Sequence, residues 1–187
     1  MLFRSRFPAA IKFKKGLKMN KVGYELSAQT KDELLRQLRV TVFYQIELWN
    51  TARLIEETLH ECQEGNWDAI LRLEQARGEL GEAIVNDDDV EKFTAGLHQP
   101  FCAVLKERQK AALRQQLQKG LWVQNELWKN AIVMAQTLDE PTDEVIWAVQ
   151  ELSIIADSGC ELVESDLDFF LGATPKGTIK QGQPLYV

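Results

Sequence analysis

The sequence is poor in the residues that bind metals and form disulfides. Its 187 residues include three cysteines, widely spaced and without a Cys-x-x-Cys pair, and only two histidines. An odd number of scattered cysteines does not predict a disulfide framework and is typical of a reducing compartment. Two histidines are too few for a histidine-rich metal site. We therefore expect no disulfide framework, no metal or other cofactor, and a cytoplasmic location.

Long hydrophobic runs and common catalytic signatures are also missing. No stretch approaches the roughly 18 apolar residues of a transmembrane candidate, and the N-terminus lacks the apolar core of a secretory signal. The motifs GxxxxGK[ST], GxGxxG and GxSxG do not occur, and serine, cysteine and histidine are not arranged as a nucleophile with a base. We therefore expect neither a transmembrane segment nor an enzyme.

Charge is unevenly distributed along the chain. Lysine and arginine total 22 and aspartate and glutamate 28, but residues 1–18 hold six basic residues and no acidic one, which leaves the remainder at −12. A body this acidic argues against a general nucleic-acid binder, which needs a basic face. The basic leader, with apolar residues between its charges, is either a membrane-surface arm or an upstream extension before a start at Met19. The second interpretation is simpler, and it is the one that we expect.

Apolar residues recur at helical spacing through most of the chain. The expected helices span residues 31–63, 67–86, 90–97, 101–138, 143–157 and 160–171. We therefore predict an all-α fold: a bundle of long antiparallel helices with coiled-coil character and shorter C-terminal helices. An irregular lead-in (1–29) and an extended tail (172–187) flank the helical bundle (30–171).

Polar residues and glycines refine these boundaries. Thr30, followed three residues later by Glu33, predicts a capping box at the start of the first helix. Gly65 predicts a tight turn and Asn66 the N-cap of the second helix, so the first two helices should form an antiparallel hairpin. Gly120 predicts a kink, a close helix contact or a weak point in the 101–138 helix. Two further N-caps are predicted at Asp87–Asp89 and at Thr142.

Two carboxylate motifs are candidate metal sites. Glu57 and His60 form the ExxH half of a di-iron site, but the second ExxH that such bundles need is missing. Glu79 and Glu82 resemble the ExxE helix of MazG-type nucleotide pyrophosphohydrolases, in which paired carboxylates hold Mg²⁺. That family also needs an ExxD pair soon afterwards, and the one ExxD here, at 140–143, spans a proline. We expect a solvated face at the first motif and keep the pyrophosphohydrolase as the alternative function.

Five tryptophans are many for a chain of this length. Trp49 and Trp128 fall on apolar stripes and are predicted to lie in the core, whereas Trp122 and Trp147 are candidates for a partner surface. The segment 145–156 is apolar nearly all round, so it is either deeply buried or available to a partner. The candidate partner-binding residues are Trp122, Val145, Ile146, Trp147, Val149, Leu152 and Ile155.

Residues 52–77 resemble a known helical hairpin. They combine Ala52-Arg53-Leu54-Ile55-Glu56-Glu57-Thr58-Leu59 with a Glu64-Gly65-Asn66-Trp67-Asp68 turn and a helix carrying Leu73-Glu74-Gln75-Ala76-Arg77. This pattern is similar to the flagellar type III export chaperones of the FliT and FlgN families. The resemblance implies a cytosolic, non-enzymatic protein that holds the amphipathic C-terminal helix of an export substrate in an apolar groove.

In such chaperones a C-terminal helix can mask the groove, and segment 145–156 would suit that role as a stand-in for the client helix. We accordingly expect the partner to be another protein, bound through helix-in-groove contacts, and no nucleic acid. A structural or regulatory bundle that acts by homo-oligomerisation is kept as a further alternative.

Overall fold

The structure is a computed structural model that describes residues 24–59, 64–77, 84–97, 104–156 and 161–174. These residues form six helices: α1 (Ala28–Leu59), α2 (Glu64–Arg77), α3 (Asp87–Ala95), α4 (Glu107–Leu138), α5 (Thr142–Ile155) and α6 (Glu164–Ala173). The prediction of an all-α fold is confirmed. None of the described helices combines the length and the apolar character that a membrane crossing requires.

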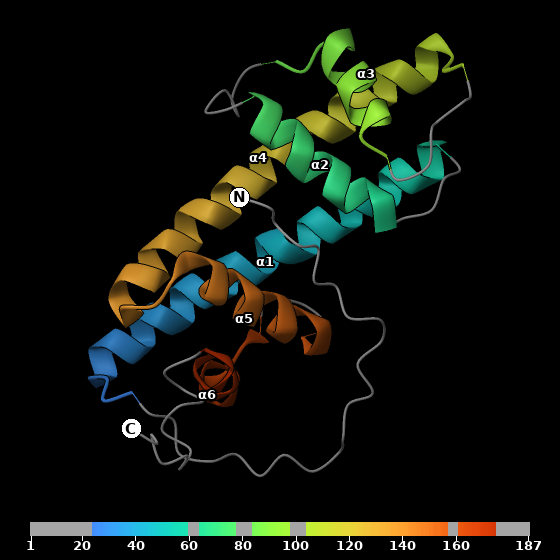
Figure 1. Cartoon of the computed structure of the whole chain (residues 1–187). Coiled ribbons are helices and arrows are strands. Elements are labelled where there is room, and N and C mark those ends of the chain that lie inside the picture. The colour runs from blue at the N-terminus through green and yellow to red at the C-terminus, as the bar shows by residue number, and fades with distance from the viewer. Residues whose placement is uncertain (1–23, 60–63, 78–83, 98–103, 157–160, 175–187) are drawn as a thin grey trace, which may run out of the picture.

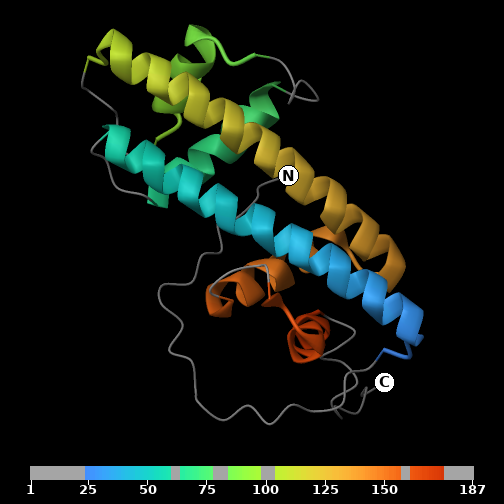
Figure 2. The ribbon, with the colours of Figure 1, turned by 180° about the vertical axis from the view of Figure 1, so that it is seen from behind.

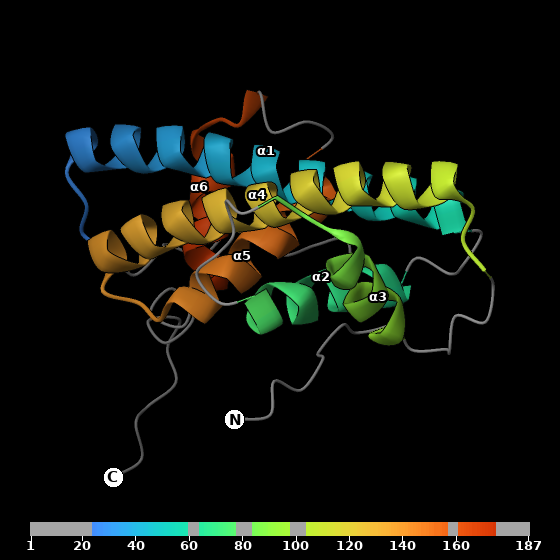
Figure 3. The ribbon, with the colours of Figure 1, turned by 90° about the horizontal axis from the view of Figure 1, so that it is seen from above.

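The two long helices form the backbone of the fold. α1 and α4, of 32 residues each, run antiparallel and pack against each other more extensively than any other pair (Figure 1). α2 and α3 cover one end of this pair, and α5 covers the other end on the same face (Figure 3). α6 packs on α5 and α1. Seen from behind, no other described helix crosses the long pair (Figure 2).

The core follows the helical period of the sequence. Residues three or four apart on α1, such as Leu34, Leu38 and Val42, are completely buried, and α4 has a matching stripe that includes Leu113 and Leu117. This spacing places the apolar side chains of each helix on a single face, which the antiparallel pair then encloses. Trp49 and Trp128, predicted to lie in the core, are half-buried.

Gly120 is a point of close helix packing. A Cβ atom built there would lie 3.4 Å from Cγ2 of Thr51 on α1 and 3.6 Å from Cδ1 of Ile70 on α2. α4 is nevertheless a single helix from Glu107 to Leu138. Of the three interpretations of this glycine, the structure supports close approach, because side chains from two neighbouring helices converge on it.

Several predicted helix ends are wrong by a few residues. α1 begins at Ala28, and Ser27 takes the capping role predicted for Thr30: the Thr30 amide donates to Ser27 Oγ at 3.1 Å. The predicted partner of that cap, Glu33, instead accepts two hydrogen bonds from Arg36. Ser27 is followed by Ala28 and Gln29, which enter the helix readily. The helix therefore begins before Thr30, and the Ser27 hydroxyl caps it.

Asn66 is not the N-cap of the second helix. α2 already begins at Glu64, so the predicted turn at Gly65 is also wrong, and residues 84–86 are not helical where a helix was predicted. Asn66 is completely buried, and its Nδ2 donates to the Ala52 carbonyl at 3.4 Å. The side-chain amide of Asn66 thus joins α2 to α1. Capping preferences alone do not predict this contact.

The first residues of α3, α4 and α5 also differ from the predicted helix starts. Asn86 caps α3 and Asp89 completes the capping box, so the acidic run lies inside the first turn. α4 begins at Glu107, and residues 104–106 are not helical where a helix from 101 was predicted. Thr142 is the first residue of α5, after Pro141 in the N-cap position. At the α4–α5 connection, Asp139 adopts the left-handed conformation, with φ 53°, that commonly ends helices.

Candidate binding surface

Three aromatic rings cluster on the outer face of the long helix pair. The Trp122 ring meets Tyr44 edge-on at 5.8 Å between centroids, and Tyr44 lies 5.8 Å from Phe43. Trp122 is 47% exposed and Phe43 45% exposed, whereas Tyr44 is half-buried between them. We call Phe43, Tyr44 and Trp122 the aromatic patch. Its contact between Tyr44 and Trp122 joins α1 to α4 at the surface of the pair.

The helical period explains why side chains of α1 point outward here. Val40, Phe43 and Leu54 are all exposed, and their spacing of three and eleven residues places them on one stripe of the helix. Leu38, on the opposite side of α1, is completely buried. Sequence reasoning found Trp122 but missed Phe43, because residues 40–43 stand out mainly as a β-favouring patch. The position of Phe43 outside the apolar stripe of Leu34, Leu38 and Val42 was the signal that would have identified it.

Polar contacts between α1 and α4 fix the position of the patch. Lys119 Nζ lies 2.6 Å from a carboxylate oxygen of Glu47, and this contact holds the pKa of Glu47 below its usual range. Further along the same seam, Gln116 Nε2 donates to Thr58 Oγ1 at 2.9 Å. These side chains tie the outer edges of the two helices together, so the patch sits on a rigid support.

An open groove continues from Trp122 along α4. Its volume is about 750 Å³. The groove is lined by Ile84, Val85, Ala111, Arg114, Gln115, Gln118, Lys119 and Trp122. At its far wall, the Ile84 side chain is 86% exposed. We call this feature the α4 groove; together with the aromatic patch it forms one continuous surface.

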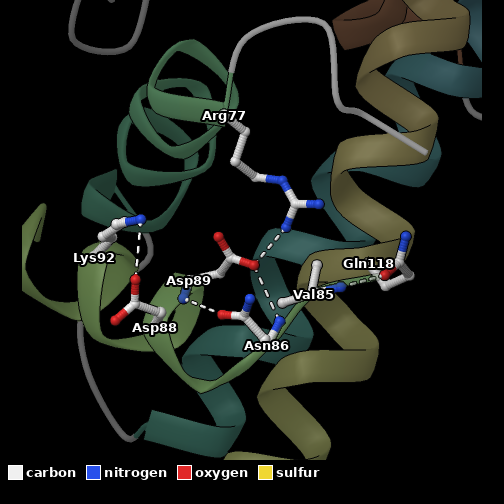
Figure 4. A network of polar contacts seen from close by, with 7 residues as sticks. All are labelled: Arg77, Val85, Asn86, Asp88, Asp89, Lys92 and Gln118. Atoms are coloured by element: carbon white, nitrogen blue, oxygen red, sulfur yellow. Dashed lines mark hydrogen bonds and ion pairs between the residues drawn. The ribbon is translucent and has the colours of Figure 1, made fainter. Parts of the chain in front are cut away.

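The wall opposite Trp122 is held in place by two contacts. The Val85 amide donates to Gln118 Oε1 at 2.8 Å (Figure 4), and Arg114 forms an ion pair with Asp87 in the first turn of α3. The first contact uses the backbone of Val85, so it fixes the non-helical segment that carries Ile84. Because Arg114 and Lys119 both have carboxylate partners, the groove is apolar in character with its charges largely compensated.

The residues predicted on α5 divide into two groups. Val145, Val149 and Leu152 are completely buried in the core shared with α1 and α4. Trp147 and Ile155 are exposed by 43% and 46%, and Ile146 is half-buried. Ile154, which was not predicted, is also exposed. The exposed group faces away from the long pair, so the structure does not bring Trp147 together with Trp122.

The structure describes only some residues of the predicted carboxylate motifs. Glu57 is exposed on α1, while His60, Glu79 and Glu82 lie outside the described residues, so the pyrophosphohydrolase alternative stays a prediction. Glu140 accepts a hydrogen bond from the Tyr24 hydroxyl at 2.5 Å. Within the described part of the chain, no group of three His, Cys, Asp or Glu side chains is arranged to hold a metal ion.

A buried polar network supports the helices beside the groove (Figure 4). Arg77 Nη1 at the end of α2 lies 2.6 Å from Asp89 Oδ2 on α3, and both side chains are less than a tenth exposed. Asp89 Oδ2 also accepts a hydrogen bond from the backbone amide of Asn86 at 3.0 Å. On α2, burial raises the pKa of Glu74 to about 7. Neither the buried pair nor this carboxyl was anticipated from the sequence.

Comparison of the chain with protein-family models, with curated proteins and with solved structures finds no match. The geometry of the exposed surfaces is therefore the evidence on which a function is proposed.

Proposed function

We propose that this chain is a non-enzymatic protein-binding module that holds an amphipathic helix of another protein on the aromatic patch and the α4 groove. One observation carries this proposal: Tyr44 contacts both Phe43 and Trp122, whose rings are exposed, and the groove continues from Trp122. Large aromatic side chains on a rigid support are the residues that most often dominate binding energy.

The size of the surface suits a helix. An amphipathic helix presents anchors three and four residues apart, which can cover a ring cluster and then follow a groove. Covering the exposed halves of Trp122 and Phe43 would contribute about 2–3 kcal/mol for each ring by apolar area. Because polar contacts already fix both helices, little conformational entropy would be lost on binding.

The resemblance of residues 52–77 to flagellar export chaperones supports the same kind of partner. It suggests a client that offers an amphipathic C-terminal helix. In this proposal the client lies on the outer face of α1 and α4, while the masking of a groove by segment 145–156 stays a separate prediction. The buried residues of that segment are shared with the core of the long pair.

The test compares two tryptophans of nearly equal exposure on different surfaces. The full chain is immobilised, partners are captured from the source cell, and the Kd of each captured protein is measured for Trp122→Ala and Trp147→Ala. We expect Trp122→Ala to weaken binding by about tenfold or more, and Trp147→Ala to leave it unchanged. A peptide carrying the captured segment should gain helical circular dichroism on binding.

Two results would contradict the proposal. One is a captured protein whose affinity is the same for wild type, Phe43→Ala and Trp122→Ala. The other is a bound peptide that gains no helix, because the surface would then recognise a different kind of segment.

A further inference from the structure

The outer side of α5 is both apolar and acidic. Trp147 and Ile154 stand seven residues apart, beside Ile155, and Glu144 and Glu151 lie on the same side of the helix. The three apolar side chains are 43%, 63% and 46% exposed. We call these five residues the α5 stripe. It is a second surface, independent of the aromatic patch.

No cation compensates the α5 stripe within the described residues. Residues 142–174 include eight acidic residues and no lysine or arginine. Of the basic side chains that reach this region, Lys31 lies 4.0 Å from Glu164, and Arg39 donates to the Leu162 carbonyl at 2.6 Å. Both therefore contact the α6 region and leave Glu144 and Glu151 without an ion pair among the residues that the structure describes.

One segment of the chain has the complementary composition. Residues 1–18 carry six basic residues and no acidic one, and apolar residues alternate with these charges. Those apolar residues are Leu2, Phe3, Phe7, Ile11, Phe13 and Leu17. Such a segment can cover apolar side chains and neutralise carboxylates at the same time.

The described chain begins beside the start of α5. The Tyr24 hydroxyl lies 2.5 Å from Glu140 Oε1 and 2.6 Å from Thr174 Oγ1. Glu140 is two residues before Thr142, the first residue of α5. Residues 19–23 can span up to about 17 Å, and α5 is about 21 Å long. A basic segment tethered at this point is therefore held at high effective concentration near the α5 stripe.

We propose that residues 1–18 dock on the α5 stripe. Their apolar side chains cover Trp147, Ile154 and Ile155, and their lysines pair with Glu144 and Glu151. This contact gives the leader a role within the protein, in contrast to the expectation from sequence that it is an upstream extension. It is independent of the function proposed for the aromatic patch.

The first experiment is zero-length carbodiimide cross-linking of the full chain at low ionic strength, followed by peptide mapping of the monomeric product. We expect links from Lys12, Lys14, Lys15 or Lys18 to Glu144 or Glu151, and their loss in a Glu144→Gln, Glu151→Gln double variant. Links of equal yield to Asp87–Asp89 would overturn the proposal, as would links to α5 found only in dimers, which would make the occupant a second copy.

The second experiment measures hydrogen exchange of residues 1–18 in the full chain. Trp147→Ala should speed their exchange by about fivefold or more, because it removes the largest apolar contact. Trp122→Ala is the matched control, since the two tryptophans are similarly exposed, and it should leave exchange unchanged. An equal effect of both variants, or of neither, would overturn the proposal. So would protection that arises only when vesicles containing phosphatidylserine are added, because the leader would then bind membranes.

Discussion

At the scale of single residues, Glu74 shows how burial changes a side chain. It lies half-buried on α2, and this burial raises the pKa of its carboxyl from 4.5 to about 7. Between these two values the folded protein binds a proton more tightly than the unfolded chain does. The free energy of unfolding contributed by Glu74 therefore falls as pH rises from about 4.5 to 7, and the penalty is complete above pH 7.

We predict that Glu74→Gln stabilises the protein at pH 8 by about 1–3 kcal/mol, the lower value reflecting the solvent that still reaches the side chain. At pH 4 the substitution should have little effect, because the carboxyl is mostly protonated in both states. Urea denaturation at the two pH values measures the difference, with the exposed Glu91→Gln as control. Equal effects of Glu74→Gln at both pH values would contradict the assignment.

At the scale of elements, a few polar contacts connect helices whose apolar faces already meet. The buried pair of Arg77 and Asp89 joins the end of α2 to the first turn of α3, and Asp89 also completes the cap of α3. By contrast, Asp88 and Lys92 form a pair at 3.3 Å on the exposed side of the same helix. The two aspartates are neighbours in sequence, but only Asp89 faces another helix.

We predict that Asp89→Ala destabilises the protein by about 3–5 kcal/mol, because a buried guanidinium loses its carboxylate and α3 loses its cap. Asp88→Ala should cost less than about 1 kcal/mol, since exposed pairs contribute little. Thermal or urea unfolding of both variants tests this contrast. Similar costs for the two substitutions would show that the Arg77–Asp89 contact is not the buried link that the structure describes.

At the scale of the whole molecule, Tyr24 brings three distant segments together. Its hydroxyl contacts Glu140 at the α4–α5 connection and Thr174 after α6. Burial, with the hydrogen bond to Glu140, raises the pKa of Tyr24 above its usual range. Arg39 on α1 adds a second link by donating to the Leu162 carbonyl before α6. These contacts fix α5 and α6 against the long pair.

We predict that Tyr24→Phe lowers the free energy of unfolding by about 1–3 kcal/mol, because the completely buried Thr174 and the Glu140 carboxylate lose a partner. Hydrogen exchange in α6 should rise more than exchange in α2. Tyr44→Phe is the control, since Tyr44 contacts its neighbours through its ring. An unfolding free energy equal to that of wild type would contradict the role assigned to the Tyr24 hydroxyl.

The sequence by itself determined the all-α class and most of the helices, because helical periodicity is a local property. It also identified Trp122 and Trp147 as surface candidates, since large aromatics outside the apolar stripes are conspicuous. The tertiary structure decided which side of each helix is covered. α5 is apolar nearly all round, so only its position on α1 and α4 selects Val145 for the core and Ile154 for the surface.

The contact of Tyr44, and through it of Phe43, with Trp122 was likewise decided by the tertiary structure. These residues are almost eighty positions apart in the sequence. Their juxtaposition depends on the antiparallel register of α1 and α4, which is set by the summed packing of two 32-residue helices. No local pattern contains that register, because it arises only when the apolar faces of both helices are buried together.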